Sequence, residues 1–215
     1  MSSITTEFAR NKIIDAMIRG QAIGTPATWY IGIFNHPYTS AATSGSTTTV
    51  INDTSKSYTT NENAGGVIRF TSGANSGLAR VIASNTATSV TVTSAFPAAP
   101  AATDTYIIMR ELVGNGYTRT ASASSLAAWA GTQGAGTTTA STGTSGKTSN
   151  NADIILPQPT GTDWLRADSV GFFDAVSAGN LWFASDLTRA KIFYTDDDAP
   201  KIRAGDLSVT ILPSA

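Results

Sequence analysis

Apolar and polar residues follow a compact pattern between residues 168 and 187, DSVGFFDAVSAGNLWFASDL. Two short apolar runs flank a turn at 177–180, where Gly and Asn tolerate a positive φ. The pattern predicts a β-hairpin. Because successive strand side chains point to opposite faces, the aromatic pairs at 172–173 and 182–183 make the hairpin apolar on both sides. One side can face the core of the protein, and the other needs a second cover.

A helix is predicted near the N-terminus, over residues 5–19. Thr5 or Thr6 can cap it, Glu7 lies in the first turn, where the helix dipole favours an acid, and Gly20 is a suitable C-cap. Apolar residues recur at helical spacing and form a broad stripe, made of Phe8, Ala9, Ile13, Ile14, Ala16, Met17 and Ile18. Two interpretations are open: the stripe packs on its own domain, or it docks on a partner chain.

The rest of the chain reads as short strands. TWYIGIF (28–34) is a strand, followed by a polar loop over 35–48. Residues 50–109 form a block of four or five strands bounded by Gly, Asn or Pro, which predicts a separate all-β module. Residues 131–150 are low in complexity, and alone they should form a flexible excursion, with Trp129 as the one anchor beside them.

These elements predict an all-β fold, a jelly-roll-like β-sandwich preceded by a helix. We expect an N-terminal anchoring helix at 1–20, a β-sandwich domain made of 21–48 and 110–215, and an inserted β module at 49–109. The insertion is inferred because the module closes on itself, and loop tips accept such insertions.

Composition narrows the possible partners. Charged residues make up 13% of the chain and the net charge is −1, so no electrostatic surface for nucleic acid or an anionic membrane is expected. The chain has no Cys, and no apolar stretch is long enough to cross a bilayer. The N-terminus has no basic segment followed by an apolar block, so we expect no secretory signal. Low charge with many Ser, Thr and Gly suits a surface that neighbouring subunits cover, or an adhesive one.

No residue set predicts catalysis or a cofactor. His36, the one histidine, precedes a proline and is expected in a turn, without a nucleophile motif. Asp196, Asp197 and Asp198 could hold Ca²⁺ but lack EF-hand spacing, and a solvated turn is the simpler interpretation. No pair of acids suits glycoside hydrolysis. The four Trp residues could stack on sugars, although core packing is the simpler interpretation. We therefore expect a non-enzyme without metal or cofactor.

Several motifs, in order, resemble a known family. NKIIDAMIRG and PATWYIGIF are followed by GNGYTR, by SNNADIILPQPTGTDW, by SVGFFDAVSAGNLWFASDL and by AGDLSVTIL. This order is similar to that of small structural proteins of tailed bacteriophages, described as tail-fibre-like or minor tail proteins. The block GGVIRFTSGANSGLARVIASNTATSVTVTSAF resembles a β module that recurs in phage tail and fibre proteins.

The resemblance implies a structural virion protein, assembled in the host cytoplasm and displayed on the particle. A tail-associated fibre or adaptor protein is the first expectation, a capsid decoration (cement) protein the second, and a host-glycan-binding module the third. The expected partners are other virion proteins and the host surface, and the chain is expected to form a homotrimer. Binding to nucleic acid and insertion into a membrane are not expected. The second hairpin face would be covered by the helix or by a neighbouring subunit, and an ordered 131–150 arm would lie against a neighbour. The expected interface residues are Phe8, Ile13, Ile14, Met17, Ile18, Trp129, Phe173 and Trp182.

Overall fold

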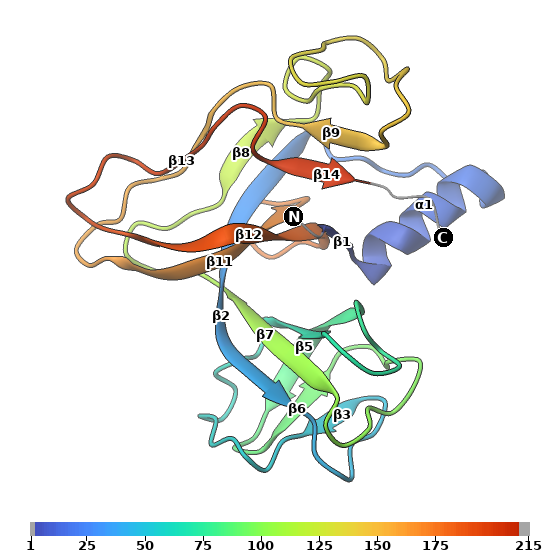
Figure 1. Ribbon diagram of the computed structural model, residues 1–215, viewed down its shortest axis with the longest axis vertical. Coiled ribbons are helices and arrows are strands. Elements are labelled where there is room, and N and C mark those ends of the chain that lie inside the picture. Colours follow the sequence, from blue (N-terminus) through green and yellow to red (C-terminus); the bar gives the residue numbers. More distant parts are fainter. Residues whose placement is uncertain (1–2, 211–215) are drawn as a thin grey trace. The chain divides into compact units, whose positions relative to one another are not determined.

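The structure is a computed structural model that describes residues 3–210 (Figure 1). The chain forms two compact units, and each has its own hydrophobic core. Unit 1 comprises Met1–Ile33 and Leu112–Ala215, and unit 2 comprises Phe34–Glu111. The module expected at 49–109 falls within unit 2. Strands account for 38% of the residues and helix for 6%, which confirms an all-β fold with an N-terminal helix.

Unit 1 is built on a large antiparallel sheet. Its strands lie in the order β1, β12, β11 and β2, and β8 pairs with the first part of β2. Two small sheets, β10–β13 and β14–β9, complete the unit. The elements of unit 1 are β1 (Ser3–Thr5), α1 (Glu7–Arg19), the first part of β2 (Thr28–Ala41), β8 (Thr120–Ala123), β9 (Lys147–Ser149), β10 (Ile154–Ile155), β11 (Trp164–Phe173), β12 (Leu181–Phe193), β13 (Lys201–Ile202) and β14 (Ser208–Thr210).

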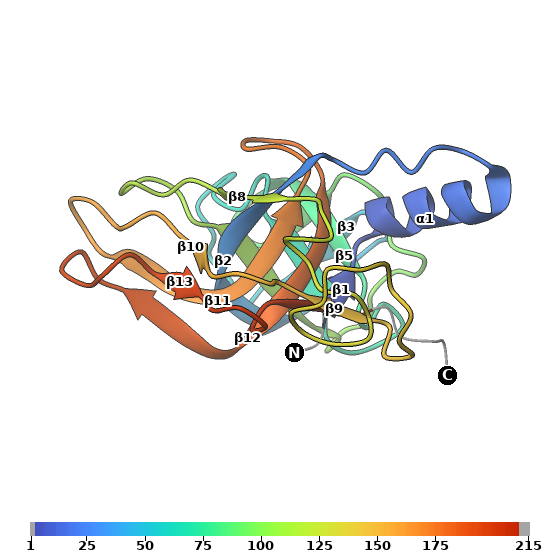
Figure 2. The ribbon, with the colours of Figure 1, turned by 90° about the horizontal axis from the view of Figure 1, so that it is seen from above.

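The core of unit 1 lies between the large sheet and the small sheets. Figure 2 shows β10 and β13 beside β11 and β12 in the view from above. Ile31 and Ile33 face this core from β2, and Val170 and Phe172 face it from β11. Trp29 on the same strand packs against this core as well. The opposite layer contributes Ile154, Leu156 and Leu207.

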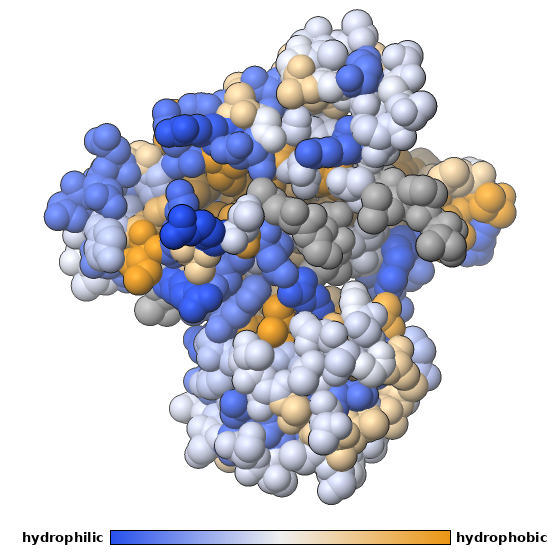
Figure 3. Space-filling view, in the orientation of Figure 1, coloured by the Kyte–Doolittle hydropathy of each residue, from blue (hydrophilic) through white to orange (hydrophobic). Residues whose placement is uncertain are grey.

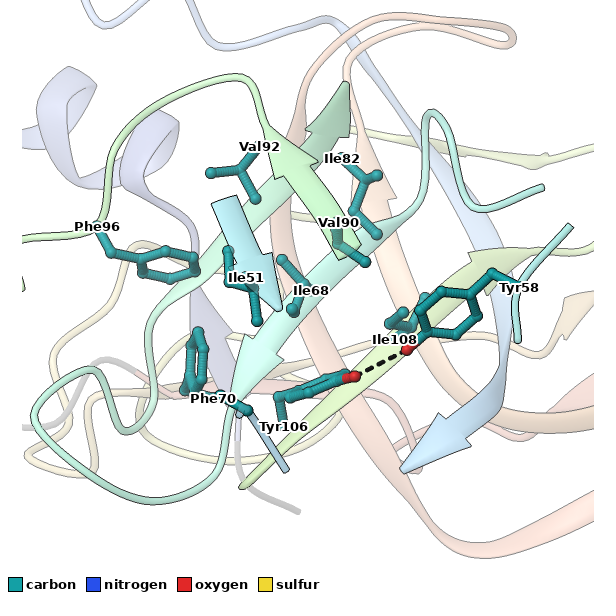
Figure 4. Close-up of a cluster of buried hydrophobic side chains, with 11 residues drawn as sticks. Ile51, Tyr58, Ile68, Phe70, Ile82, Val90, Val92, Phe96, Tyr106 and Ile108 are labelled. Atoms are coloured by element: carbon teal, nitrogen blue, oxygen red, sulfur yellow. Dashed lines mark hydrogen bonds between the residues drawn. The ribbon is translucent and has the colours of Figure 1, made fainter. Parts of the chain in front are cut away.

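Unit 2 is an antiparallel sheet with the strand order β7, β4, β5, β6 and β3, and the second part of β2 pairs with β7. Its core gathers residues from every strand, and Figure 4 shows Phe70, Tyr106 and Ile108 among them. The five strands β3–β7 agree with the four or five expected in this block. They are β3 (Val50–Asn52), β4 (Val67–Phe70), β5 (Ala79–Asn85), β6 (Ser89–Val92) and β7 (Thr105–Glu111).

The polar loop expected at 35–48 was predicted wrongly over its first half. Residues 35–41 continue β2, because their backbone pairs with β7 from Asn35↔Arg110 to Ala41↔Thr105. The register shifts between Asn35 and Tyr38, so Pro37 lies at a bulge, where a residue without an N–H is tolerated. His36 lies at the same bulge and not in a turn.

Candidate functional site

Helix α1 begins where the sequence indicates. Thr6 is the N-cap, and its Oγ1 accepts a hydrogen bond from the Ala9 amide at 3.3 Å. The same hydroxyl lies 2.7 Å from the Leu181 carbonyl oxygen, and the Thr6 amide donates to the Trp182 carbonyl at 3.0 Å. Gly20 ends the helix in the left-handed conformation, at φ 66°. One residue therefore both starts the helix and ties it to β12.

The inner face of α1 packs on the hairpin. Ala9 is fully buried, and the Phe8 ring meets the Trp182 ring edge to face, with centroids 5.1 Å apart. Ile13 is half-buried. The helix therefore covers one aromatic position of the hairpin within the same chain.

The outer face of α1 is apolar and exposed. Ile14 is 55% exposed, Met17 is 77% exposed and Ile18 is 80% exposed. These positions follow i, i+3 and i+4 spacing, so the three side chains share one face. Figure 3 shows hydrophobic surface at the outer end of the helix. Arg10 and Asn11 are exposed one turn earlier on the same face. We name the surface of Ile14, Met17 and Ile18 the outer helix face.

Phe173 and Trp182 do not contribute to an exposed surface. Phe173 is 6% exposed, and the Arg119 guanidinium stacks over its ring at 3.3 Å from the centroid. Trp182 is 3% exposed beneath Phe8. The second face of the hairpin is thus covered from within the chain, by the helix and by Arg119. Arg119, which had no assigned role, is the last residue of the GNGYTR motif.

The Asp174 carboxylate accepts three hydrogen bonds at the end of the hairpin. Asp174 accepts hydrogen bonds from the Asn180 amide at 2.7 Å and the Asn180 side chain at 2.8 Å, and from the Trp182 indole at 3.2 Å. Desolvation raises the pKa of Asp174, but these hydrogen bonds outweigh it and the pKa is lowered. Residues 174–180 join the two strands, which is a longer connection than the turn expected at 177–180, and φ is positive at Ala178 and Gly179 and not at Asn180.

Trp129 packs on the core of unit 1 and not on an open surface. Its ring lies 5.3 Å from that of Phe172, and its indole donates to the Ala123 carbonyl at 3.1 Å. The backbone of Trp129 forms an isolated bridge with Asn150. Of the eight expected interface residues, the structure brings Ile14, Met17 and Ile18 together on one exposed face, and it packs the aromatic ones within the chain.

The low-complexity segment is ordered by its own hydrogen bonds. The Gln133 side chain donates to Thr139 and Ala140 and accepts from the Thr142 amide, all within 3.1 Å. The Asn151 side chain accepts from the Gly136 amide and donates to the Thr137 carbonyl, both at 3.0 Å. These bonds connect the loop within the chain, and its contact with a neighbouring subunit stays a prediction.

A cavity of about 510 Å³ lies between the aromatic core and this loop. Trp29, Trp129 and Phe183 form part of its wall, and the hydroxyls of Ser124, Ser141 and Thr148 line it as well. No charged side chain, Asn or Gln is among its lining residues. The cavity therefore offers aromatic rings that could stack on a sugar, and among its lining residues there is no carboxylate or amide side chain to bond the sugar hydroxyls.

The loop that contains Asp196, Asp197 and Asp198 is bonded through its backbone to Gln158 and Asp163. Gln158 donates to the carbonyls of Thr195 and Asp197, and Asp163 accepts from the Thr195 amide at 2.8 Å. Within residues 3–210, no group of three His, Cys, Asp or Glu side chains has the arrangement of a metal site, so Ca²⁺ at Asp196–Asp198 gains no support. In the same range, no helix has the length and apolar character needed to cross a membrane.

Comparison with known proteins gives one family. Residues 71–210, more than half of the chain, match the family described as Podophage GP4 fiber I protein gp80. The match begins in unit 2 and continues through the hairpin to β14. None of the curated proteins matches significantly. The order of motifs resembles phage tail-fibre-like proteins, and the family match points to the same class of protein. The chain belongs to the Gp80 family of podophage fibre I proteins.

Proposed function

We propose that this protein is a non-enzymatic, tail-associated fibre or adaptor subunit, attached to a neighbouring virion protein through the outer helix face. Family membership supports a structural role in a phage virion. The outer helix face carries the attachment, because Ile14, Met17 and Ile18 leave apolar surface uncovered at the end of a helix that is otherwise docked. Burying such a side chain contributes about 1.5–3 kcal/mol.

The test replaces the three residues together, with Ile14→Ser, Met17→Ser and Ile18→Ser in the full chain. These side chains are exposed, so the fold should be preserved, and circular dichroism checks that it is. The matched control is Arg10→Ser with Asn11→Ser, on the same face one turn earlier. Quantitative mass spectrometry of purified particles measures copies per virion. We expect at least a tenfold loss for the triple variant and no loss for the control.

Full occupancy of the folded triple variant would overturn attachment through this face. The location is tested separately, by fractionating particles into heads and tails. Recovery with tails is expected, and recovery with heads would instead favour a capsid decoration protein. The expected homotrimer is tested by light scattering on the purified chain, which has a monomer mass of 22.2 kDa.

A further inference from the structure

A second cavity lies in unit 1, on the side of the hairpin away from the turn. Its volume is about 340 Å³, at the lower end of the range for ligand pockets. Its apolar floor is formed by the half-buried side chains of Leu187, Phe193 and Ile202, and core residues such as Leu156 and Val170 lie beneath them at less than 4% exposure. Figure 3 shows hydrophobic surface in the hollow between β12 and β13, with hydrophilic side chains on either side.

An irregularity in β12 builds one wall of this cavity. Ser169 pairs with Asp186, but Ala167 pairs with Lys191, so a single residue of β11 faces four residues of β12. Residues 187–190 interrupt the regular pairing, and Leu187, Thr188 and Arg189 among them line the cavity. Bulges redirect side chains and are enriched beside functional sites.

The rim of the cavity is cationic. Arg189, Lys191 and Lys201 line it, with Asp206 as the one carboxylate. Lys201 pairs with Asp153 at 3.1 Å. Arg189 and Lys191 are exposed and form no ion pair within residues 3–210. In a chain of net charge −1, this rim concentrates positive charge above an apolar floor.

We propose that this cavity binds an amphipathic organic anion. Its carboxylate or phosphate contacts Arg189 and Lys191, and its hydrocarbon part lies on Leu187, Phe193 and Ile202. The planar guanidinium of arginine suits either head group, because it can donate two parallel hydrogen bonds. The outer helix face has no part in this site, so the proposal stands independently of the mode of attachment.

The test titrates the full chain with octanoate and octyl phosphate by isothermal calorimetry. Octanol tests the hydrocarbon part alone, and acetate and inorganic phosphate test the head groups alone. The variant is Arg189→Ser with Lys191→Ser, and the control is Arg10→Ser with Lys147→Ser, two exposed cations that do not line the cavity. Both doubles remove the same charge.

We expect the octyl anions to bind at least tenfold more tightly than octanol, acetate or phosphate. The Arg189→Ser/Lys191→Ser variant should bind octanoate at least tenfold more weakly than the natural protein, and the control variant less than twofold more weakly. Methyl NMR shifts should change at Leu187 and Ile202, which line the cavity and are half-buried. The proposal would be overturned if octanol bound as tightly as the octyl anions, or if the two double variants bound octanoate equally well. NMR shifts confined to other parts of the protein would overturn it as well. Cosedimentation with phosphatidylglycerol vesicles but not with phosphatidylcholine vesicles would show that the bound anion is a lipid. Absence of cosedimentation with either would show that it is a free organic anion.

Discussion

The Tyr106 hydroxyl donates a hydrogen bond of 2.6 Å to Oδ2 of Asp53 inside the core of unit 2. Both residues are at most 1% exposed. The Tyr58 hydroxyl lies 2.7 Å from that of Tyr106, as Figure 4 shows, and donates to it because Tyr106 already donates to the carboxylate. A buried charge is thus stabilised by a chain of two phenols.

Replacing Tyr106 by Phe should destabilise unit 2 by about 2–3 kcal/mol, since a buried carboxylate loses a charge-assisted hydrogen bond. Tyr58→Phe is the graded control. It removes only the neutral bond to Tyr106 and should cost about 1 kcal/mol. Urea unfolding of the two variants measures the difference. Equal costs would show that Asp53 does not depend on the Tyr106 hydroxyl.

The same carboxylate should make unit 2 sensitive to acid. Desolvation raises the pKa of Asp53, but hydrogen bonds from Ser40, Ser55 and Tyr106 outweigh it and lower the pKa. A lowered pKa contributes stability that is fully present above the unfolded value, about 3.9, and is lost as pH falls through the folded value. We expect the urea midpoint to fall on going from pH 6 to pH 3.

The variant Asp53→Asn isolates this effect. It should be less stable than the natural protein at pH 6, because the charge-assisted bond is lost, but its midpoint should change less between pH 6 and pH 3. An unchanged pH dependence would place the acid sensitivity at other carboxylates, such as Asp174.

Arg119 should be needed for the order of the hairpin turn. Its guanidinium covers the Phe173 ring and donates to the carbonyls of Ala175 and Ala178 at 2.7 Å each. Arg119→Ala should cost about 2 kcal/mol, because the ring is uncovered and two hydrogen bonds are lost. Hydrogen exchange at 175–180 should accelerate. Arg119→Lys, which keeps the charge but not the planar fork, should recover less than half of the loss.

Gln133 should control the order of the low-complexity loop. Gln133→Ala removes three hydrogen bonds that join both sides of the loop, and Gln133 itself is exposed. Limited proteolysis within 134–146 should become several times faster, while the urea midpoint changes little. Thr144→Ala, in the same loop, is the control. Protease resistance in the Gln133 variant would show that other contacts order the loop.

Local signals in the sequence were sufficient for part of this structure. Thr6, Glu7 and Gly20 mark the helix, and Gly179 and Asn180 mark the hairpin turn, because caps and turns depend on neighbouring residues. The aromatic pairs indicated two covered faces, and both are covered. The covering groups come from distant parts of the chain, so the pattern did not distinguish Phe8 and Arg119 from a partner subunit.

Other features depend on contacts far apart in the sequence. Residues 35–41 look like a loop because they are polar, and only the backbone of β7 makes them a strand. Asp53 looks like a surface acid, since its partner Tyr106 is 53 residues away. The register shift in β12 cannot be recognised from the sequence DLTRAK and is seen only in the pairing with β11.

The chain passes between the two units at 33–34 and at 111–112. Phe34 and Glu111 are paired strand partners, so the two ends of unit 2 are held one strand spacing apart. If residues 34–111 were an unstructured loop, bringing the two ends of that loop together would cost unit 1 roughly 4 kcal/mol of chain entropy. When unit 2 is folded, the pairing of Phe34 with Glu111 already holds these two ends together, so the adjoining residues of unit 1 start close to each other. We therefore expect the folding of unit 2 to lower the chain entropy that unit 1 loses when it folds.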